Sequence, residues 1–297
     1  MICIKFGGGL GNQMFQYGMY LLMRKLYPKA KIKIDLDSYK YAHFHTGFDL
    51  KRVFAVEIPN YDLKNKYSKV EYYYYKIRVN LKKIFCSLNI MGVKSFNGDN
   101  PHVNPELFHL NAKRYNYLYA TWESEYYISQ VKDEVFKAFK FKPFRMDKNI
   151  MIQKDMLDNY SVSLHIRRGD YLNSPFVALA ETDYYVKALE YIKDLGKEKL
   201  KLFIFSDDIE WCRNNLNISD ISSVYINWNN GLDSFEDMHL MSLCKCNVIA
   251  NSTFSWWGAF LNQSKSPLVI CPKQYYKDIE YNNVFIDYHY PKNWILI

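Results

Sequence analysis

The segment that decides the fold reads S-V-S-L-H-I-R-R-G-D and spans residues 161–170. Its first six residues have the apolar, β-branched character of a buried strand, and a charged loop follows them. This alternation of a short apolar run and a helix-forming segment continues through the second half of the chain. Strands are expected at 161–166, 201–205, 224–226, 248–250 and 268–270, and helices at 183–195, 208–215, 232–244 and 254–261. Five strands alternating with four helices predict a parallel, Rossmann-like sheet covered on both faces.

The first half of the chain opens in a similar way. Residues 2–6 predict a strand, residues 7–12 a glycine loop and residues 13–27 a helix, and Ile32 and Ile34 then alternate with lysine as a second strand. This order is typical of the start of an α/β unit.

The chain has 297 residues, about twice the length of a typical single domain, so two domains fit it. The mixed polar sequence at 140–160 is the best candidate for a junction. We therefore expect an α/β protein with one Rossmann-like domain over residues 1–150 and a second over residues 151–297.

The composition is that of a globular protein. Hydrophobic residues make up 49% and charged residues 24% of the chain, which excludes a largely disordered protein. The formal net charge of +8 permits nucleic acid, phosphate-bearing substrates or an anionic membrane as partners, and selects none of them. We expect no nucleic-acid partner, because the interleaved basic and aromatic motif of such modules is missing.

Most of the excess positive charge lies in one stretch. Residues 64–94 hold eight Lys and Arg side chains and one Glu, and helical spacing of apolar residues over 70–88 predicts a basic amphipathic helix there. Such a helix packs against its own domain or lies on anionic lipid. Both interpretations stay open.

The cysteine spacing, the N-terminal sequence and the lengths of the apolar runs predict where in the cell the protein works. Six Cys without paired spacing indicate buried free thiols in a reducing compartment. The N-terminal sequence lacks signal-peptide features, and no run of 18 apolar residues occurs. We expect a cytoplasmic protein, at most peripheral to the inner membrane.

Polar residues follow the expected strands where ligands bind in open α/β sheets, beyond the carboxyl ends of the strands. In the first half these include Gly9, Gly11 and Asn12, directly before a helix whose free N–H groups suit an anion or a polar sugar. The spacing differs from the dinucleotide fingerprint G-x-G-x-x-G. A tight turn without a ligand is the alternative.

Two adjacent arginines, Arg167 and Arg168, follow the strand at 161–166 and lie between His165 and Asp170. Side chains of adjacent extended residues point to opposite faces, so we expect one arginine to reach a ligand and the other to pair within the protein, with Asp170 as a partner. A guanidinium suits a phosphate because its donors match the oxygens. A surface ion-pair cluster is the alternative.

Two further loops complete the candidate site. Asp207 and Asp208 follow the strand at 201–205. Either can cap the helix that begins there, and Asp207 is also a candidate ligand contact. The loop after the strand at 248–250 concentrates an amide and three hydroxyls at the start of a helix, which favours phosphate binding over a plain N-cap. These residues are Asn251, Ser252, Thr253 and Ser255. The neighbouring Trp256 and Trp257 are expected to pack between helix and sheet.

We expect no metal site. Asp35 and Asp37 form a D-x-D pattern, which is common by chance, and Asp37 is expected to cap a helix or turn. Ser234 and Asp237 form a capping-box pattern that explains the acidic residues around them structurally.

Three segments together resemble the α1,2-fucosyltransferase family of glycosyltransferases. They are G-G-L-G-N-Q-M-F-Q-Y at 8–17, H-I-R-R-G-D-Y at 165–171, and N-S-T-F-S-W-W-G-A at 251–259, with lesser support from W-E-S-E at 122–125 and F-S-D-D at 205–208. The resemblance spans nearly the full chain. It implies two Rossmann-like domains facing a cleft, the GT-B arrangement, with the nucleotide sugar in the C-terminal domain and the acceptor chiefly on the N-terminal domain.

The same resemblance implies a reaction. L-fucose passes from GDP-β-L-fucose to O2 of a terminal galactose with inversion and without a metal or other cofactor, in bacterial surface polysaccharide synthesis. Arg167 would stabilise the leaving β-phosphate and Asn12 would position reacting groups. The general base stays open among Glu123, Glu125, Asp170, water and phosphate.

Other functions remain compatible with these residues. A fucosyltransferase of another linkage, α1,6 or protein-directed, shares the arginine segment. A catalytically inert nucleotide-sugar or glycan-binding protein would share the binding residues without transfer.

Overall fold

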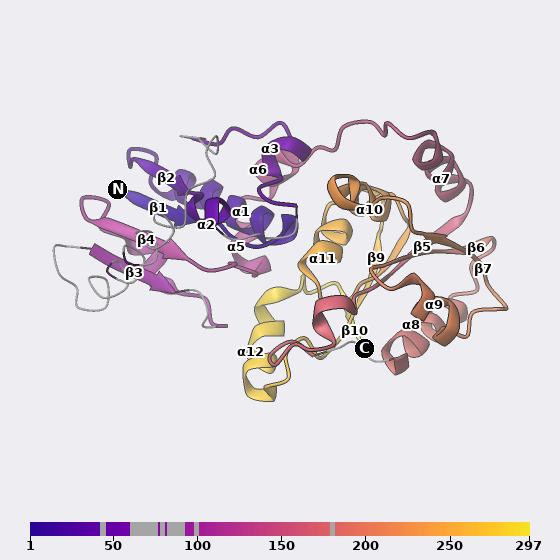
Figure 1. Ribbon diagram of the computed structural model, residues 1–297. Coiled ribbons are helices and arrows are strands. Elements are labelled where there is room, and N and C mark those ends of the chain that lie inside the picture. The colour runs from indigo at the N-terminus through magenta and orange to yellow at the C-terminus, as the bar shows by residue number, and fades with distance from the viewer. Residues whose placement is uncertain (42–45, 60–76, 78–80, 82–92, 98–100, 179–181) are drawn as a thin grey trace. The chain divides into compact units, whose positions relative to one another are not determined.

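The computed structural model describes residues 1–41, 46–59, 77, 81, 93–97, 101–178 and 182–297 (Figure 1). Apart from residues 77 and 81, the expected helix at 70–88 lies outside the described residues, and so does nearly all of the basic stretch 64–94. The chain divides into two compact units, Met1–Lys140 and Phe141–Ile297. The division precedes residue 150 because helix α7 (Asp147–Asp158) packs on strand β5 (Tyr160–Ile166) and helix α10 (Phe235–Met241).

The first unit contains a parallel sheet in the order β2-β1-β4-β3. Its central pair places the ends of β1 and β4 side by side, with Lys5 opposite Tyr119. The strands are β1 (Ile2–Lys5), β2 (Ile32–Asp35), β3 (Val93–Asn97) and β4 (Tyr115–Tyr119). The helices are α1 (Leu10–Leu26), α2 (Asp37–Tyr41), α3 (Leu50–Val53), α5 (Glu125–Ser129) and α6 (Lys132–Ala138), with a 3-10 turn, η2, at Pro105–His109.

The second unit contains a parallel sheet in the order β10-β9-β8-β5-β6-β7. Strands β6 and β7 follow β5 on one side of the sheet, and β8, β9 and β10 then follow on the other side. This is the Rossmann order, with its switch point between β5 and β8. The other strands are β6 (Leu200–Ser206), β7 (Ser222–Ile226), β8 (Cys246–Val248), β9 (Leu268–Cys271) and β10 (Ile295–Leu296). The helices are α8 (Thr182–Asp194), α9 (Ile209–Asn215), α11 (Thr253–Phe260) and α12 (Ile279–His289), with 3-10 turns η3 (Gly169–Tyr171) and η4 (Gly231–Asp233).

Alternating side chains of the central strands enter two separate cores. On β6, Leu202 and Ile204 pack with residues of α8 and α9. Phe203 and Phe205 point to the opposite face and pack with residues of α7 and α10. Figure 1 shows these two groups of helices on opposite sides of the second sheet. The expected sheet covered on both faces is therefore confirmed, because a strand with a two-residue period buries both of its faces this way.

Several local expectations need correction. The strand expected at 248–250 is β8 at Cys246–Val248, because residues 250–252 already turn, with the Ser252 N–H donating to the Ala250 carbonyl at 2.8 Å. Ser234 does not act as a capping-box residue: its backbone is already helical after η4, and its side chain makes no cap hydrogen bond. Trp256 and Trp257 are fully buried, as expected.

Among the described residues, no helix is long and apolar enough to cross a membrane.

A buried polar network ties α7 to the segment before α10. Asn149 is fully buried, accepts a hydrogen bond from Trp228 Nε1 at 2.7 Å and donates to Asn229 Oδ1 at 2.9 Å. Asn229 in turn donates to Asp237 Oδ1 at 2.7 Å. Desolvation raises the pKa of Asp237 to about 7, and the negative charge of Glu236 adds to the rise, while the hydrogen bond from Asn229 lowers it.

This raised pKa predicts a pH-dependent stability. Between about pH 4, where the unfolded carboxyl titrates, and about pH 7, the folded state holds a proton that the unfolded state has lost. The free energy of unfolding therefore falls as pH rises through this window, by at most about 1.4 kcal/mol per pH unit from this group. We expect Asp237→Asn, which keeps an oxygen acceptor for Asn229, to gain stability relative to wild type over the same window.

Urea unfolding at several pH values between 4 and 8 measures this difference. Asp220→Asn is the matched control, since Asp220 is exposed and pairs with Lys193 at 2.7 Å. A constant offset between Asp237→Asn and wild type across the window would contradict the prediction.

Candidate functional site

The glycine loop after β1 is held by two buried glutamines of α1. Gln13 Nε2 donates to the Gly8 carbonyl at 3.1 Å, and Gln16 accepts from the Gly7 N–H at 3.0 Å. Gly8 has φ +80°, and a Cβ at this position would lie 2.6 Å from Nδ2 of Asn12. A side chain at residue 8 would therefore both strain the backbone and displace Asn12, which explains the glycine.

The loop after β4 lies beside the glycine loop, because β4 neighbours β1 in the sheet. Gln16 Nε2 joins the two loops by donating to the carbonyls of Gly7 and Ala120, at 3.2 Å each. The loop contains Trp122, a buried residue with φ +60°, whose indole N–H has no hydrogen-bond partner among the described residues. Left-handed backbone is unusual for a bulky residue and is concentrated at functional sites.

The strained turn places the acidic residues at the carboxyl end of β4. The Ser124 N–H donates to the Trp122 carbonyl at 2.8 Å, so the chain reverses tightly around Glu123 before α5 begins at Glu125. Glu123 is half-buried. Asn12, in the first turn of α1, and Glu123, in the loop after β4, thus follow adjacent strands of the first unit.

Arg167 is held between two carboxylates of the second unit. Its Nε and Nη2 donate to Asp170 Oδ1 at 3.0 and 2.7 Å, and its Nη1 lies 3.0 Å from Asp207 Oδ2. We expected Asp170 to pair with the arginine that does not reach the ligand, and this is wrong, because Asp170 pairs with Arg167 itself. The 3-10 turn at 169–171 brings the Asp170 carboxylate back toward residue 167. The Arg167 side chain stays about one-quarter exposed, so a ligand can reach it.

Arg168 is fixed from both ends. Its backbone N–H donates to Asp207 Oδ1 at 2.9 Å, and its guanidinium lies 3.3 Å from Asp208 Oδ2 and 3.9 Å from the ring centre of Trp211. Asp208 also accepts the Trp211 N–H at 3.0 Å as the N-cap of α9. The capping role suggested for this acidic pair thus belongs to Asp208, while Asp207 holds the arginine loop.

The end of β5 carries a neutral imidazole. His165 is buried, and desolvation, with a smaller contribution from the charge of Arg167, lowers its pKa to about 3. In the described part of the chain its Nδ1 has no hydrogen-bond partner. The neutral form of His165 is therefore favoured at neutral pH, and in this form one ring nitrogen donates and the other accepts a hydrogen bond.

The loop after β8 combines buried and accessible groups. Asn251 is fully buried, and its Nδ2 donates to the carbonyls of Ala178 and Tyr275. These bonds connect the loop after β8 to the segments before α8 and after β9. Ser252 caps α11 by accepting the Phe254 N–H at 3.3 Å. Ser255 is fully buried and its hydroxyl donates within the chain, to the carbonyls at 250 and 252. Thr253, at the first position of α11, is the more accessible of the three hydroxyl residues.

The two D-x-D carboxylates serve local structure. Asp35 accepts a hydrogen bond from Tyr117 Oη at 2.9 Å and from the Asp37 N–H at 3.0 Å, and Asp37 pairs with Lys40 at 3.1 Å. The structure contains no group of three or more His, Cys, Asp or Glu side chains placed to hold a metal, within the residues it describes.

The structure gathers the predicted site residues into two groups, one on each unit. Each group follows the carboxyl ends of the strands at a switch point, β1 and β4 in the first unit and β5 and β8 in the second. The first group contains Gly9, Gly11, Asn12 and Glu123, and the second contains His165, Arg167, Arg168, Asp170, Asp207, Asn251, Ser252, Thr253 and Ser255.

Sequence reasoning missed the supporting roles of three residues. Gln13 and Gln16 are buried polar residues on an otherwise apolar helix face, and this contrast is the signal that could have identified them. No local pattern marks Trp122 as left-handed.

The Arg167 guanidinium and the start of α11 follow the neighbouring strands β5 and β8, an arrangement suited to a diphosphate. A guanidinium binds phosphate through paired hydrogen bonds, and free N–H groups at a helix start add to the attraction. A pair of Rossmann-like sheets with such a site defines the GT-B class of glycosyltransferase.

The chain belongs to glycosyltransferase family 11. The model of this family, described as "Glycosyl transferase family 11", matches residues 1–297. The resemblance to the α1,2-fucosyltransferase family stated from the sequence is thereby confirmed.

Two relatives that match nearly the whole chain are bacterial. The chain is 33% identical to the O-antigen biosynthesis glycosyltransferase WbnK of Escherichia coli, over 91% of this chain and 93% of the relative. It is 29% identical to an α-1,2-colitosyltransferase of Escherichia coli, over 100% and 99%. A bovine galactoside 2-α-L-fucosyltransferase, SEC1, is 33% identical over 34% of this chain and 28% of the relative.

Solved structures share the fold. An Arabidopsis thaliana FUT1 variant in complex with GDP gives a TM-score of 0.53 at 12% identity, covering 90% of this chain and 69% of that one. The α-1,6-fucosyltransferase NodZ, from Bradyrhizobium, soaked with GDP-fucose, gives 0.50 at 11% identity, covering 88% and 92%. The GT-B fold class predicted from the sequence is confirmed.

The support of the arginine loop can be tested without changing any charge. A Cβ at Gly169 would lie 2.6 Å from Asp207 Oδ2, so Gly169→Ala must push away the carboxylate that holds Arg167 and Arg168. We expect the Kd for inorganic pyrophosphate, measured by calorimetry, to rise about tenfold, or 1.4 kcal/mol.

The thermal unfolding midpoint serves as the control in this experiment. Gly169 begins an exposed one-turn segment, so we expect the midpoint to stay close to that of wild type. An unchanged pyrophosphate affinity would show that Asp207 does not position the arginines for an anion.

Proposed function

We propose that the protein transfers L-fucose from GDP-β-L-fucose to O2 of a terminal galactose, with inversion, during synthesis of a bacterial surface polysaccharide. The observation that carries the proposal is the Arg167 and Arg168 loop at the switch point of the second sheet, in a chain that matches glycosyltransferase family 11 throughout. The family and its relatives support glycosyltransferase activity. The similarity to a bovine galactoside 2-α-L-fucosyltransferase supports the donor, the acceptor and the linkage.

The GDP diphosphate would bind between Arg167, which follows β5, and the start of α11, which follows the neighbouring strand β8. Asp170 occupies the Nε and Nη2 side of Arg167, but this carboxylate is 58% exposed, so the pair is weak and a phosphate can replace it. Asp207 would keep hold of Nη1 meanwhile. The accessible Thr253 hydroxyl and the N–H groups beginning α11 would complete the phosphate contacts.

Transfer would proceed by a single displacement. The acceptor oxygen attacks C1 of fucose on the face opposite GDP, the bond from C1 to the β-phosphate oxygen breaks, and GDP leaves with the negative charge. Positive charge develops on the sugar ring and negative charge on the diphosphate. Arg167 would stabilise the diphosphate charge in place of a metal ion, so we propose a metal-independent reaction.

The base for the acceptor proton stays open among Glu123, Glu125 and Asp170. Glu123 is favoured by the strained turn at Trp122, which fixes it beside the glycine loop. We expect Glu123→Gln to lower turnover about a hundredfold and to remove the acidic limb of the pH–rate profile. Profiles of the same shape for Glu123→Gln and wild type would exclude Glu123 as the base.

Colitosyl transfer is a second candidate. It is favoured by the full-length similarity to an α-1,2-colitosyltransferase. Colitose is fucose without the 3-hydroxyl group, so a site that hydrogen-bonds this hydroxyl discriminates strongly between the two donors.

Cytoplasmic location and peripheral membrane contact through residues 64–94 belong to the proposal as well.

The experiment that tests the proposal is transfer from GDP-fucose and GDP-colitose to a panel of β-galactosides, with and without EDTA, followed by linkage analysis. We expect fucose on galactose O2 in the presence of EDTA. Preferred transfer of colitose would establish the second candidate. Activity lost in EDTA and restored by a divalent ion would contradict the metal-independent mechanism.

The same assay tests Arg167. We expect Arg167→Ala to lower turnover at least about a hundredfold, because the charge developing on the diphosphate loses its guanidinium. The matched control is Arg213→Ala, since Arg213 lies on the last turn of α9 and stacks on Tyr225 at 4.2 Å. Near-normal turnover of Arg167→Ala would refute the assignment.

A further inference from the structure

A basic surface lies at the amino edge of the first sheet, where β1, β2 and β4 begin. We call this surface the basic edge. Its six cationic side chains are exposed except for one, Lys33, which is half-buried: Arg24, Lys29, Lys31, Lys33, Lys113 and Arg114. Strand β1 has four residues, so about 13 Å of strand separates this edge from the glycine loop at the other end. The basic edge is therefore separate from the candidate functional site.

The strand register brings together the two chain segments that carry most of these cations. Ile2 pairs with Ile32 of β2 on one side and with Asn116 of β4 on the other. Neighbouring strands are about 4.8 Å apart, so the segments that lead into β2 and β4, residues 28–31 and 111–114, lie about 10 Å apart. This distance is close to the Debye length of about 10 Å at 0.1 M salt. The charges of the two segments therefore act together on a partner.

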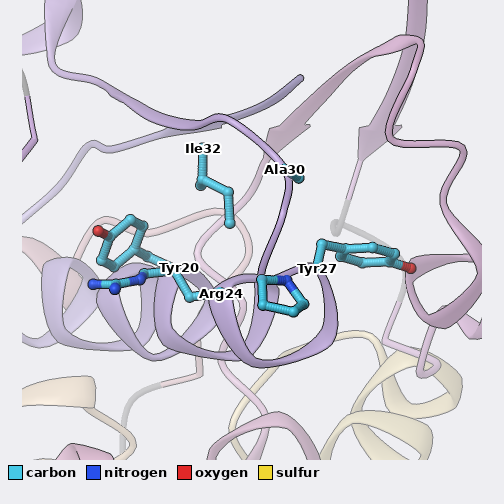
Figure 2. Close-up of a pocket in the computed structure, with 6 residues that line it drawn as sticks. Tyr20, Arg24, Tyr27, Ala30 and Ile32 are labelled. Atoms are coloured by element: carbon cyan, nitrogen blue, oxygen red, sulfur yellow. The ribbon is translucent and has the colours of Figure 1, made fainter.

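The end of helix α1 adds Arg24 to the basic edge. Arg24 and Ala30 line the same hollow of about 300 Å³, and Figure 2 shows Arg24 near the end of the helix, with Ala30 and Ile32 on the segment that leads into β2. The Ala30 N–H donates to the Tyr27 carbonyl at 2.9 Å, which ties this segment to the end of the helix. The guanidinium is therefore held close to the lysines that precede β2.

Carboxylates do not balance the positive charge of the basic edge. Residues 20–34 and 110–117 contain no Asp or Glu. Within the part of the chain that the structure describes, none of the six cations forms an ion pair, whereas the neighbouring Lys25 pairs with Glu134 at 3.6 Å. Like charges held on one folded edge repel one another, and a bound anionic surface relieves this repulsion. The edge is therefore suited to a negatively charged partner.

The chemistry of the edge favours a lipid surface over a nucleic acid. Four of the six cations are lysines, whose ammonium groups act as point charges and require no matched geometry of the partner. Single-stranded nucleic acids stack on exposed aromatic rings. The rings beside the edge do not offer such faces, because Tyr20 is 5% exposed and Tyr115 stacks on Tyr117 with ring centres 6.4 Å apart. Anionic headgroups need only positive charge, and each Lys or Arg near them strengthens binding about fivefold.

We propose that the basic edge is a docking surface for the anionic headgroups of a membrane. Docking requires neither donor nor acceptor, nor residues 64–94, so the proposal goes beyond the glycosyl transfer argued above and stands if that transfer fails. A membrane bound here meets the amino ends of β1 and β4. Asn12 and Glu123, which follow the carboxyl ends of these strands, then lie at the end away from the lipid.

Vesicle flotation of the full-length protein tests this surface. The anionic vesicles contain phosphatidylglycerol and phosphatidylethanolamine, and vesicles of phosphatidylcholine alone are the neutral comparison. We expect binding to the anionic vesicles at about 0.1 M salt and at least a tenfold loss of binding at about 0.5 M salt, because salt screens exposed charges. The proposal is overturned if the anionic vesicles are not bound, if both kinds of vesicle are bound equally, or if salt does not weaken binding.

A triple variant of the edge locates the contact. We expect Lys29→Gln, Lys31→Gln and Lys113→Gln together to weaken binding to the anionic vesicles about a hundredfold, at about fivefold for each lysine. These three side chains are exposed, so the thermal unfolding midpoint and the Kd for inorganic pyrophosphate should stay those of wild type. Vesicle binding as tight as that of wild type would place the membrane contact elsewhere in the chain and overturn the proposal.

A second triple variant and a competitor separate the edge from net charge and from nucleic acid. Lys187→Gln, Lys265→Gln and Lys273→Gln remove the same charge from exposed lysines of the second unit, and we expect them to leave vesicle binding near that of wild type. Equal weakening by the two triple variants would show that net charge attracts the lipid. Duplex DNA at the same phosphate concentration should not displace the protein from the vesicles. Complete displacement would make the edge a nucleic-acid site and overturn the proposal.

Discussion

The carboxylate of Asp207 is the constraint on which the second unit's loops depend. It lies just beyond the end of β6 and accepts hydrogen bonds from the Arg168 backbone and the Arg167 guanidinium beyond the end of β5. Together with Asp170 and Asp208, it offsets the repulsion between two adjacent cations. Gly169 lies so close to the same carboxylate that a side chain would not fit there. The position of Asp207 therefore depends on the glycine at residue 169.

The first unit fixes its loop by a different means. The glycine loop is held by uncharged amides, Gln13 and Gln16, both nearly inaccessible to solvent. Gln13 also accepts the Asp49 N–H at 2.8 Å, so one side chain secures two loops. Buried amide bonds are insensitive to salt, whereas ion pairs at the surface weaken as salt rises. The two halves of the candidate site should therefore respond differently to ionic strength.

The sequence predicted the parts that depend on periodicity and local chemistry. The alternation around 161–170 correctly implied a parallel two-faced sheet, and the glycines and arginines marked loops at strand ends. Partner choice was harder to predict, because it depends on tertiary distance. Asp170 pairs with Arg167 through a 3-10 turn, and Asp207 and Asp208 both hold the arginine loop, Asp208 while it caps α9. The sequence position of Ser255 predicted a phosphate contact, but its buried hydroxyl donates to backbone carbonyls of the same loop.

Each of the two compact units is one continuous stretch of sequence, and the division falls between Lys140 and Phe141. The second unit has its own sheet in complete Rossmann order, with a separate core on each face of its central strands. One genetic crossover near this point would exchange an entire unit while leaving every strand neighbour of the other unchanged. Recombination among relatives at this point can therefore exchange one unit as a whole, and a chimaera joined there keeps the complete sheet of each parent unit.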